Sequence, residues 1–264
     1  MDLELTGKRA IVTGGSRGIG LAVADRLAAE GADVALLARD RDALDRAAGH
    51  VGRHGTRVLA RSADTRDDAA VRAAVAAVVD AFGGVDVLVN AAAQPAGGAV
   101  PPLPELTDDA LRDEVETKVL GYLRCARAVA PHMVAQGWGR IVSVSGLNAR
   151  STGSLVGSVR NVAVAAMTKN LADELGASGV NVTVVHPGTT RTERTEGLLA
   201  DRAARDGTTA EEVAARFAAG TSIGRMVTAA EVADVVAFLA SPRSVAINGD
   251  AIPVGGGARG TIHY

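Results

Sequence analysis

A glycine-rich turn near the start of the chain has the residue types and spacing needed to bind a dinucleotide. In IVTGGSRGIG, Gly14, Gly18 and Gly20 lie between a short apolar segment and a helical pattern. Glycines there let the backbone turn tightly and approach a pyrophosphate, which rests on the N-terminus of the following helix. A tight turn without a ligand is the alternative, but the position of the motif between an expected strand and an expected helix favours dinucleotide binding.

The residues after the second apolar segment bear on the choice of nucleotide. In ALLARDRDAL, Arg39 comes at the expected strand end, and Arg17 lies inside the glycine turn. Two guanidinium groups near the adenosine ribose can pair with a 2′-phosphate, which predicts NADP as the cofactor. Asp40 could instead accept a hydrogen bond from a ribose hydroxyl, so NAD is the alternative. In a third interpretation both arginines are solvated surface charges.

Strand-like and helix-like segments alternate along the whole chain and would position these residues. The strand-like segments are short, β-branched and bounded by Gly, Asp or Asn. They are residues 9–15, 33–39, 56–64, 85–93, 139–146, 180–188 and 250–257. Apolar residues at helical spacing lie between them, as in residues 18–31 and 67–84. This alternation predicts an α/β Rossmann fold with a doubly wound parallel sheet of about seven strands and helices on both faces.

One domain is expected over residues 1–264, with one long excursion from the sheet inside it. Residues 189–224, called the excursion below, are polar and rich in Arg and Glu. Segments of this length between sheet elements are usually lids or binding loops. The excursion is therefore predicted to be a substrate lid.

The composition limits the kinds of partner and compartment. Hydrophobic residues make up 47% of the 264 residues and aromatic residues only 2%, so the core has to be built from Val, Leu, Ile and Ala. A net charge of −2 gives no general attraction to nucleic acid or to an anionic membrane, and no apolar run is long enough to cross a bilayer. The lone cysteine, Cys125, and a start without a signal-peptide pattern predict a cytoplasmic protein. No metal site is expected.

The order and spacing of several motifs resemble the short-chain dehydrogenase/reductase family nearly end to end. Besides the TGxxxGxG turn, the chain has NAAA at 90–93 where the family has NNAG, HPG at 186–188, IGR at 223–225 and NGDAIPVGGG at 248–257. The resemblance implies that a nicotinamide dinucleotide is held by Gly14, Ser16, Arg17, Gly18, Ile19, Gly20, Arg39, Asp64, Asn90, Pro187, Gly188, Thr190 and Thr192. It gives Asp64 the adenine contact, and Thr190 and Thr192 the contacts to the carboxamide and the phosphate.

The catalytic tetrad that this resemblance implies is substituted. The family uses a tyrosine as proton donor or acceptor, a lysine four residues later, a serine, and an asparagine on the preceding long helix. MTKNLADELG at 167–176 resembles the family's MTKSLAxEL and fixes the register. In that register the tyrosine position is Gly157 and the lysine position is Asn161. On the preceding helix, VETKVLGYL has Lys118 where the family has the asparagine of ETN. This departure predicts a non-standard active site.

Lys118, Ser145 and Asn161 are the candidate catalytic residues. A lysine that loses its water beside a closed site has a lowered pKa and a usable proton. The alternative for Lys118 is a surface ion pair with Glu114, four residues earlier on the same helix. Asn161 could hold the nicotinamide ribose in place of the lysine, or be a plain polar residue of a helix. The serine position falls on Ser145 or Gly146, depending on the length of the following loop.

Other polar residues could take part in the site. Arg160 could contact the nicotinamide ribose, and Asn148, Ser154 and Ser158 could donate hydrogen bonds to a carbonyl or simply form a polar loop. The terminal Tyr264 follows the last expected strand by about ten residues, which in extended form reach roughly 33 Å and hence a cleft of this or a neighbouring chain.

A substrate with negative charge is suggested by the arginines that open the excursion. Arg191 and Arg194 could recognise a carboxylate or a coenzyme A thioester, with Asn148 as a further substrate contact. In the alternative interpretation they are solvated charges balanced by Glu193 and Glu196.

Three functions agree with these features. The first is an NADP(H)-binding oxidoreductase that acts on a small carbonyl or hydroxyl substrate with a non-standard active site. The second is a catalytically silent subunit that supports an active homologous partner, and the third is a lyase or isomerase that no longer turns over the cofactor. Family members pack as dimers or tetramers through two long helices, expected here at about 106–136 and 157–176, so a homo-oligomer or a hetero-oligomer with an active subunit is expected.

Overall fold

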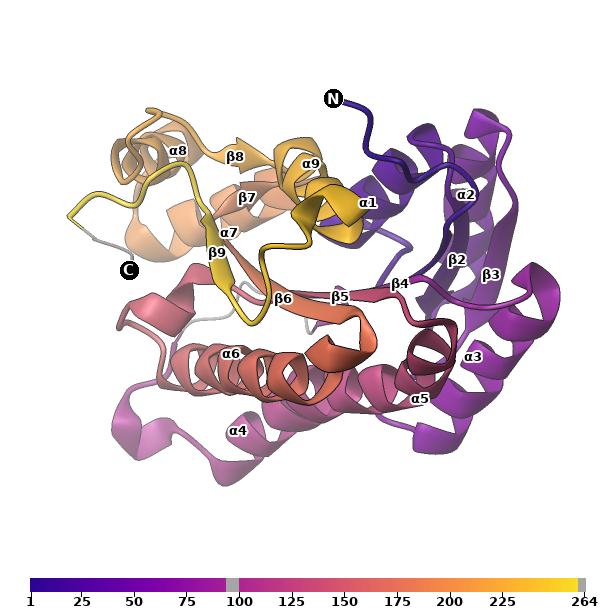
Figure 1. The fold of residues 1–264 in the computed structure, drawn as a ribbon. Coiled ribbons are helices and arrows are strands. Elements are labelled where there is room, and N and C mark those ends of the chain that lie inside the picture. Colours follow the sequence, from indigo (N-terminus) through magenta and orange to yellow (C-terminus); the bar gives the residue numbers. More distant parts are fainter. Residues whose placement is uncertain (94–99, 261–264) are drawn as a thin grey trace.

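A seven-stranded parallel sheet forms the centre of the computed structural model, which describes residues 1–93 and 100–260 (Figure 1). The strands are β1 (Arg9–Thr13), β2 (Asp33–Ala38), β3 (Val58–Ser62), β4 (Val87–Asn90), β5 (Gly139–Val144), β6 (Val180–Pro187) and β9 (Ala251–Val254). Their order across the sheet is β3-β2-β1-β4-β5-β6-β9, and neighbouring strands are parallel. The direction of winding reverses between β1 and β4, so the predicted doubly wound Rossmann fold is confirmed.

Helices cover both faces of this sheet (Figure 1). One face packs against α1 (Gly18–Ala29), α2 (Arg41–Val51) and α9 (Ala229–Ala240), and the other against α3 (Asp68–Phe82), α5 (Gly121–Gln136) and α6 (Leu155–Leu175). The long helix expected over residues 106–136 is interrupted. It consists of α4 (Asp108–Glu114) and α5, joined by a π-helical turn at Val115–Leu120.

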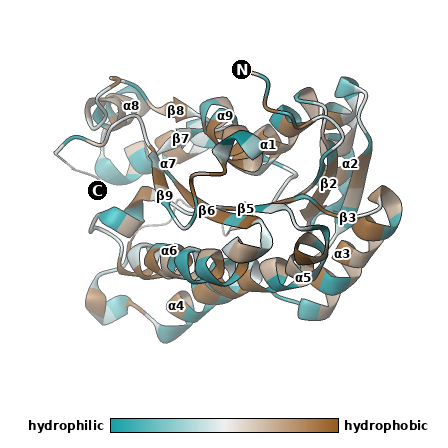
Figure 2. Cartoon of the chain, viewed as in Figure 1, coloured by the Kyte–Doolittle hydropathy of each residue, from teal (hydrophilic) through white to brown (hydrophobic). Residues whose placement is uncertain are grey.

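The core is aliphatic, as the composition predicts. Every residue of β5 and β6 is buried, and Figure 2 shows hydrophobic residues along the strands with hydrophilic ones on the outward turns of the helices. Helices on both faces explain why β5 and β6 are buried along their whole length, including polar residues such as Asn181 and Thr183. Cys125 lies in this core as a free thiol, and burial raises its pKa to about 12. Within the described ranges, no helix is long and apolar enough to cross a membrane.

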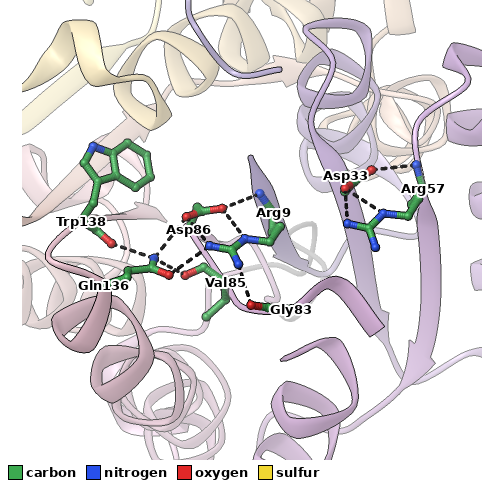
Figure 3. A network of polar contacts seen from close by, with 8 residues as sticks. All are labelled: Arg9, Asp33, Arg57, Gly83, Val85, Asp86, Gln136 and Trp138. Atoms are coloured by element: carbon green, nitrogen blue, oxygen red, sulfur yellow. Dashed lines mark hydrogen bonds and ion pairs between the residues drawn. The ribbon is translucent and has the colours of Figure 1, made fainter. Parts of the chain in front are cut away.

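Two ion pairs lie at the amino ends of β1, β2 and their neighbouring strands (Figure 3): Arg9 with Asp86, 22% and 9% exposed, and Arg57 with Asp33, 56% and 14% exposed. Arg9 of β1 donates from Nε and Nη2 to the two carboxylate oxygens of Asp86, at 2.6 and 2.8 Å, and these hydrogen bonds raise the pKa of Arg9. Gln136 at the end of α5 joins this network through Nε2, which donates to Asp86 Oδ1 at 3.2 Å. Asp33 of β2 accepts two hydrogen bonds from the Arg57 guanidinium just before β3. These contacts cross-link β1 to the residues before β4, and β2 to the start of β3.

The excursion is more ordered than a loop. It contains the short strand β7 (Thr190–Arg191) and the helices α7 (Thr195–Asp206) and α8 (Ala210–Ala219), and β7 pairs with β8 (Val227–Thr228) just beyond it. The two helices share a small apolar cluster of Leu199, Ala203 and Val213. Its far end is held by the segment after β9, because Ser222 N donates to Gly257 O at 2.7 Å.

Candidate functional site

The glycine turn lies between β1 and α1, at the carboxyl edge of the sheet where the winding reverses. Gly14 has a φ of +67°, and a Cβ on it would come within 2.8 Å of the Ala91 carbonyl oxygen. A Cβ on Gly20 would lie 2.3 Å from the carbonyl oxygen of Gly14. Only glycine fits at both positions, and Ser16 and Ile19 complete the turn. Its bare backbone amides at the start of α1 are the donors that an anionic ligand would use.

One of these amides contacts the excursion. The Gly18 N–H donates to both carboxylate oxygens of Glu193, at 3.1 and 3.2 Å. Sequence reasoning considered Glu193 only as a counter-charge for neighbouring arginines and missed this contact. The two residues are 175 positions apart, so no local pattern could have revealed it.

Arg17 and Arg39, the two arginines expected to contact the adenosine part of the cofactor, are exposed. Among the described residues, the guanidinium groups of Arg17 and Arg39 have no hydrogen bond or ion pair. Asp40, the candidate for a ribose hydroxyl, is instead the N-cap of α2, and its Oδ1 accepts from Ala43 N at 3.0 Å. Asp64 Oδ1 accepts from Arg66 N at 3.0 Å. The guanidinium groups of Arg17 and Arg39 are therefore available to a ligand, whereas the Asp40 carboxylate caps α2.

Lys118 is buried inside the π-helical turn, with 4% of its surface exposed. Its Nζ donates to the Ser145 carbonyl oxygen at 3.0 Å. The expectation of a surface ion pair with Glu114 is wrong, because Glu114 pairs with Arg160 of α6. Burial, together with the nearby Arg160 charge, lowers the pKa of Lys118 to about 7. A lysine with this pKa can give or take a proton near neutral pH, and π-helical turns are frequent at functional sites.

Ser145 and Asn161 lie next to Lys118 at the carboxyl end of β5. Ser145 Oγ donates to the main-chain oxygen of Asn161 at 3.3 Å. A Cβ on Gly146 would lie 3.0 Å from Asn161 Nδ2, so the asparagine side chain packs against the backbone just after Ser145. The structure therefore brings the three predicted catalytic residues together. Tyr122 is fully buried beneath them and its hydroxyl donates to Val144 O at 2.9 Å, so it does not face a substrate.

Gly157 faces a small polar group at the start of α6. A Cβ on Gly157 would lie 2.8 Å from Ser154 Oγ and 3.1 Å from Asn148 Nδ2. Ser154 is the N-cap of α6 and Ser158 Oγ donates to Ser151 O at 2.9 Å, so both serines stabilise local structure. Asn148 is exposed and keeps its amide available. Tyr264, the other candidate donor, lies outside the described residues.

The residues after β6 lead from the sheet into the excursion. Pro187 ends β6, Gly188 N donates to Val254 O of β9 at 3.2 Å, and Thr190 Oγ1 donates back to Gly188 O at 2.9 Å. Thr192 N donates to Thr195 Oγ1 at 2.8 Å, which begins α7. The two arginines differ. Arg191 pairs with Glu196 at 2.9 Å, as the alternative interpretation had it, whereas the Arg194 guanidinium has no partner among the described residues.

Buried polar atoms without a hydrogen-bond partner lie at this carboxyl edge of the sheet. They include both amide atoms of Asn90 at the end of β4, Oδ1 of Asn161, and Oγ1 of Thr117 beside Lys118. Native proteins leave few such groups unpaired, because each is costly, so this edge suits a polar ligand. These unpaired groups and the glycine turn suit the polar groups of a nicotinamide dinucleotide. In the described parts of the chain, no group of three or more His, Cys, Asp or Glu side chains could hold a metal ion.

Known proteins agree with this architecture. A model of the short chain dehydrogenase family matches residues 8–203. The L-sorbose reductase from Gluconobacter frateurii, solved in complex with NADPH and L-sorbose, is 31% identical with a TM-score of 0.92, covering 99% of this chain and 100% of that one. An actinorhodin polyketide ketoreductase solved with NADPH is 34% identical with a TM-score of 0.88, covering 94% and 96%. The 3-oxoacyl-acyl-carrier-protein reductase FabG of Vibrio cholerae is 32% identical over 265 residues, 97% of this chain and 98% of that protein. The chain belongs to the short chain dehydrogenase family.

Proposed function

We propose that this chain is an NADP(H)-dependent oxidoreductase for a small carbonyl or hydroxyl substrate, with Lys118 as its proton donor and acceptor. The observation that carries the proposal is the buried Lys118 ammonium, which lies 3.0 Å from the Ser145 carbonyl oxygen at the carboxyl end of β5. A charged group is buried at such cost only where it is paired or used, and neither Glu114 nor any other carboxylate pairs with it in the described residues.

The cofactor proposal rests on the glycine turn and on the exposed cations beside it. The backbone amides near Gly18, Ile19 and Gly20 would hold the pyrophosphate, and Arg17 and Arg39 would hold a 2′-phosphate. Asp40 is used as a helix cap, which weakens the case for NAD. The L-sorbose reductase and the actinorhodin ketoreductase, both similar over nearly their whole length, were solved with NADPH.

Replacing Arg39 by alanine is expected to weaken NADPH binding about 10-fold to 150-fold, because one charge-assisted hydrogen bond to a phosphate contributes roughly 1.5–3 kcal/mol. NADH affinity should change less than about twofold. Fluorescence titration of both nucleotides measures this, with Arg46→Ala on the outer part of α2 as the control. Unchanged NADPH affinity in the Arg39 variant would remove this residue from the site.

The chemical steps can be assigned to residues of this chain. When bound, a reduced nicotinamide supplies the hydride for a carbonyl carbon. Lys118 then gives a proton to the carbonyl oxygen, and in the reverse direction its neutral amine takes the proton from the hydroxyl. Ser145, whose hydroxyl makes only a long hydrogen bond to Asn161 O, can turn to orient the carbonyl. In this proposal Gly157 and Asn161 occupy the positions of the missing tyrosine and lysine, and Asn161 positions the ribose through its unpaired Oδ1.

The proposed substrate class is a small carbonyl compound with a negative charge or a thioester. Arg194 opens α7 with a guanidinium that no carboxylate in the described residues neutralises, and the Asn148 amide lies beside Gly157. Both are donors suited to a carboxylate or an acyl carbonyl. The name of the similar 3-oxoacyl-acyl-carrier-protein reductase points to the same class.

The proposal is tested by following NADPH absorbance with a panel of ketones, aldehydes and 3-oxoacyl thioesters. We expect oxidation of the cofactor with at least one 3-oxoacyl thioester, at a rate that rises as the pH falls toward 6. Tight NADPH binding without oxidation of any substrate would contradict the reductase and favour the catalytically silent subunit or the lyase and isomerase alternatives.

A surface on α6 supports assembly with a second chain of this fold. Leu155, Val159 and Val162 are 50%, 45% and 49% exposed and follow one another at helical spacing. Exposed apolar stripes of this kind are typical of protein–protein interfaces. We propose that α6 forms the interface of a homo-oligomer, and a hetero-oligomer with an active subunit is the alternative if the chain proves silent.

A further inference from the structure

Helix α1 begins without a cap of its own. Its N-cap residue is Arg17, which makes no side-chain hydrogen bond to the helix, and the first turn of this 12-residue helix carries no acidic residue. The first amides of a helix have no partner within it and attract negative charge. Other helices that cover the sheet have a side chain that accepts from their first amides: Asp40 caps α2, Asp67 caps α3, and Thr228 caps α9. The start of α1 is thus left for an anion from elsewhere.

Glu193 supplies that anion. Its carboxylate accepts the Gly18 N–H with both oxygens. A Cβ added at Gly18 would lie 3.9 Å from Thr192 Cγ2 and 4.0 Å from Glu193 Oε1. The side chain comes from the loop between β7 and α7, so the contact joins the excursion to the glycine turn. Glu193 is exposed and has no cation of its own within the described residues, which leaves it free to move.

We infer that Glu193 acts as a latch, because its carboxylate holds the excursion against the glycine turn until a dinucleotide binds. The pyrophosphate of the dinucleotide then displaces the carboxylate from the Gly18 amide. This inference rests on the proposed cofactor binding. A pyrophosphate and a carboxylate both carry negative charge and both seek the first amides of α1, and like charges at hydrogen-bond distance repel. The carboxylate must therefore leave when the cofactor arrives. Cofactor binding is thereby coupled to a rearrangement at Glu193 that leaves Thr190 and Thr192 beside the glycine turn.

Glu193→Gln tests the latch, because glutamine keeps the shape of the side chain and removes its charge. Glu193→Gln is expected to bind NADPH about 5-fold to 10-fold more tightly than the unaltered chain, since less has to be displaced. The matched control is Glu196→Gln, three residues along the same segment, where the carboxylate pairs with exposed Arg191. It removes the same charge and should change affinity less than about twofold. Equal affinity in both variants, or weaker binding in Glu193→Gln, would overturn the inference.

A second measurement uses no cofactor. In a chain labelled with ¹⁵N-glycine, the Gly18 amide signal should move in Glu193→Gln and stay in place in Glu196→Gln. Addition of NADPH to the unaltered chain should move the same signal. An unmoved Gly18 signal in Glu193→Gln would show that the latch contact is absent, whatever the affinities. Failure of every variant to bind NADPH or NADH would overturn the proposed function instead, and the Gly18 signal would still decide the contact.

Discussion

Replacing Lys118 by methionine is expected to lower turnover about 10²-fold to 10⁴-fold, the usual contribution of a positioned acid or base. NADPH affinity should change less than about twofold, because Lys118 is assigned to the proton and not to the nucleotide. In the unaltered chain the rate of carbonyl reduction should fall as the pH rises through about 7, since the protonated amine is the acid and its pKa is lowered to about 7. The oxidation of an alcohol should show the opposite dependence.

The control for this variant is Lys169→Met on α6. Lys169 is exposed and pairs with Asp173 one turn away, so its loss should leave both turnover and the pH profile unchanged. Single-turnover kinetics at several pH values separates the two variants. Equal turnover in Lys118→Met and the unaltered chain would exclude Lys118 as the proton donor.

The same substitution should stabilise the fold. Lys118 is almost fully buried, and a fall in its pKa from 10.5 to about 7 corresponds to roughly 5 kcal/mol of lost stability at low pH. Below pH 7 the lysine is charged in both states and the whole penalty applies. Between about 7 and 10.5 the unfolded chain binds more protons, so stability rises with pH, and above 10.5 the penalty is gone. Urea unfolding should therefore show Lys118→Met to be more stable by roughly 2–4 kcal/mol at pH 6, after the lost hydrogen bond to Ser145 is deducted.

Asp86→Ala is expected to destabilise the chain by about 1–3 kcal/mol, the effect of removing the acceptor of charged, partly buried hydrogen bonds. The Asp86 side chain is 9% exposed and accepts from the Arg9 backbone as well as from its guanidinium. Without it, the Arg9 charge at the start of β1 loses its partner. The free energy of unfolding in urea measures the loss, and NADPH affinity of the folded variant should be unchanged, because the network lies at the opposite end of the strands from the glycine turn.

A matched control for this charge removal is Asp173→Ala, whose carboxylate is 66% exposed and pairs with Lys169 on the surface of α6. Surface pairs of this kind contribute at most about 1 kcal/mol. If Asp86→Ala destabilised no more than Asp173→Ala, the network at the amino end would not hold the strands together.

The strands could be predicted because their signals are local. Segments such as GRIVSVSG and VNVTVVHPG are rich in Val and Ile and bounded by Gly, and they contain the strands β5 and β6, which are buried at every residue. The two-residue strands β7 and β8 carry no such signal, since they are defined only by pairing with each other. The helices α7 and α8 lie in a polar segment, where their small shared cluster gives only a weak apolar pattern.

The surroundings of Lys118 could not be predicted from helical spacing. In an α-helix, residues four apart lie on one face, which made Glu114 the expected partner. The π-helical turn, which begins directly after Glu114, has more residues per turn than an α-helix. Lys118 is therefore rotated away from Glu114 and its Nζ reaches the residue after β5. Glu114 pairs with Arg160 of α6 instead. The side chains near Gly157 posed a similar difficulty, because Asn148 and Gly157 belong to different elements that only the fold brings together.

The parallel direction of all neighbouring strands in the sheet has a consequence for how the chain tolerates change. β1 shows this most clearly: it starts at Arg9, which pairs with Asp86, and ends at Thr13, whose Oγ1 accepts from Ala91 N beside the glycine turn. The position of a substitution along a strand then decides its phenotype. We expect a substitution near the start of β1 to lower the amount of folded protein, and one near its end to act mainly on ligand binding.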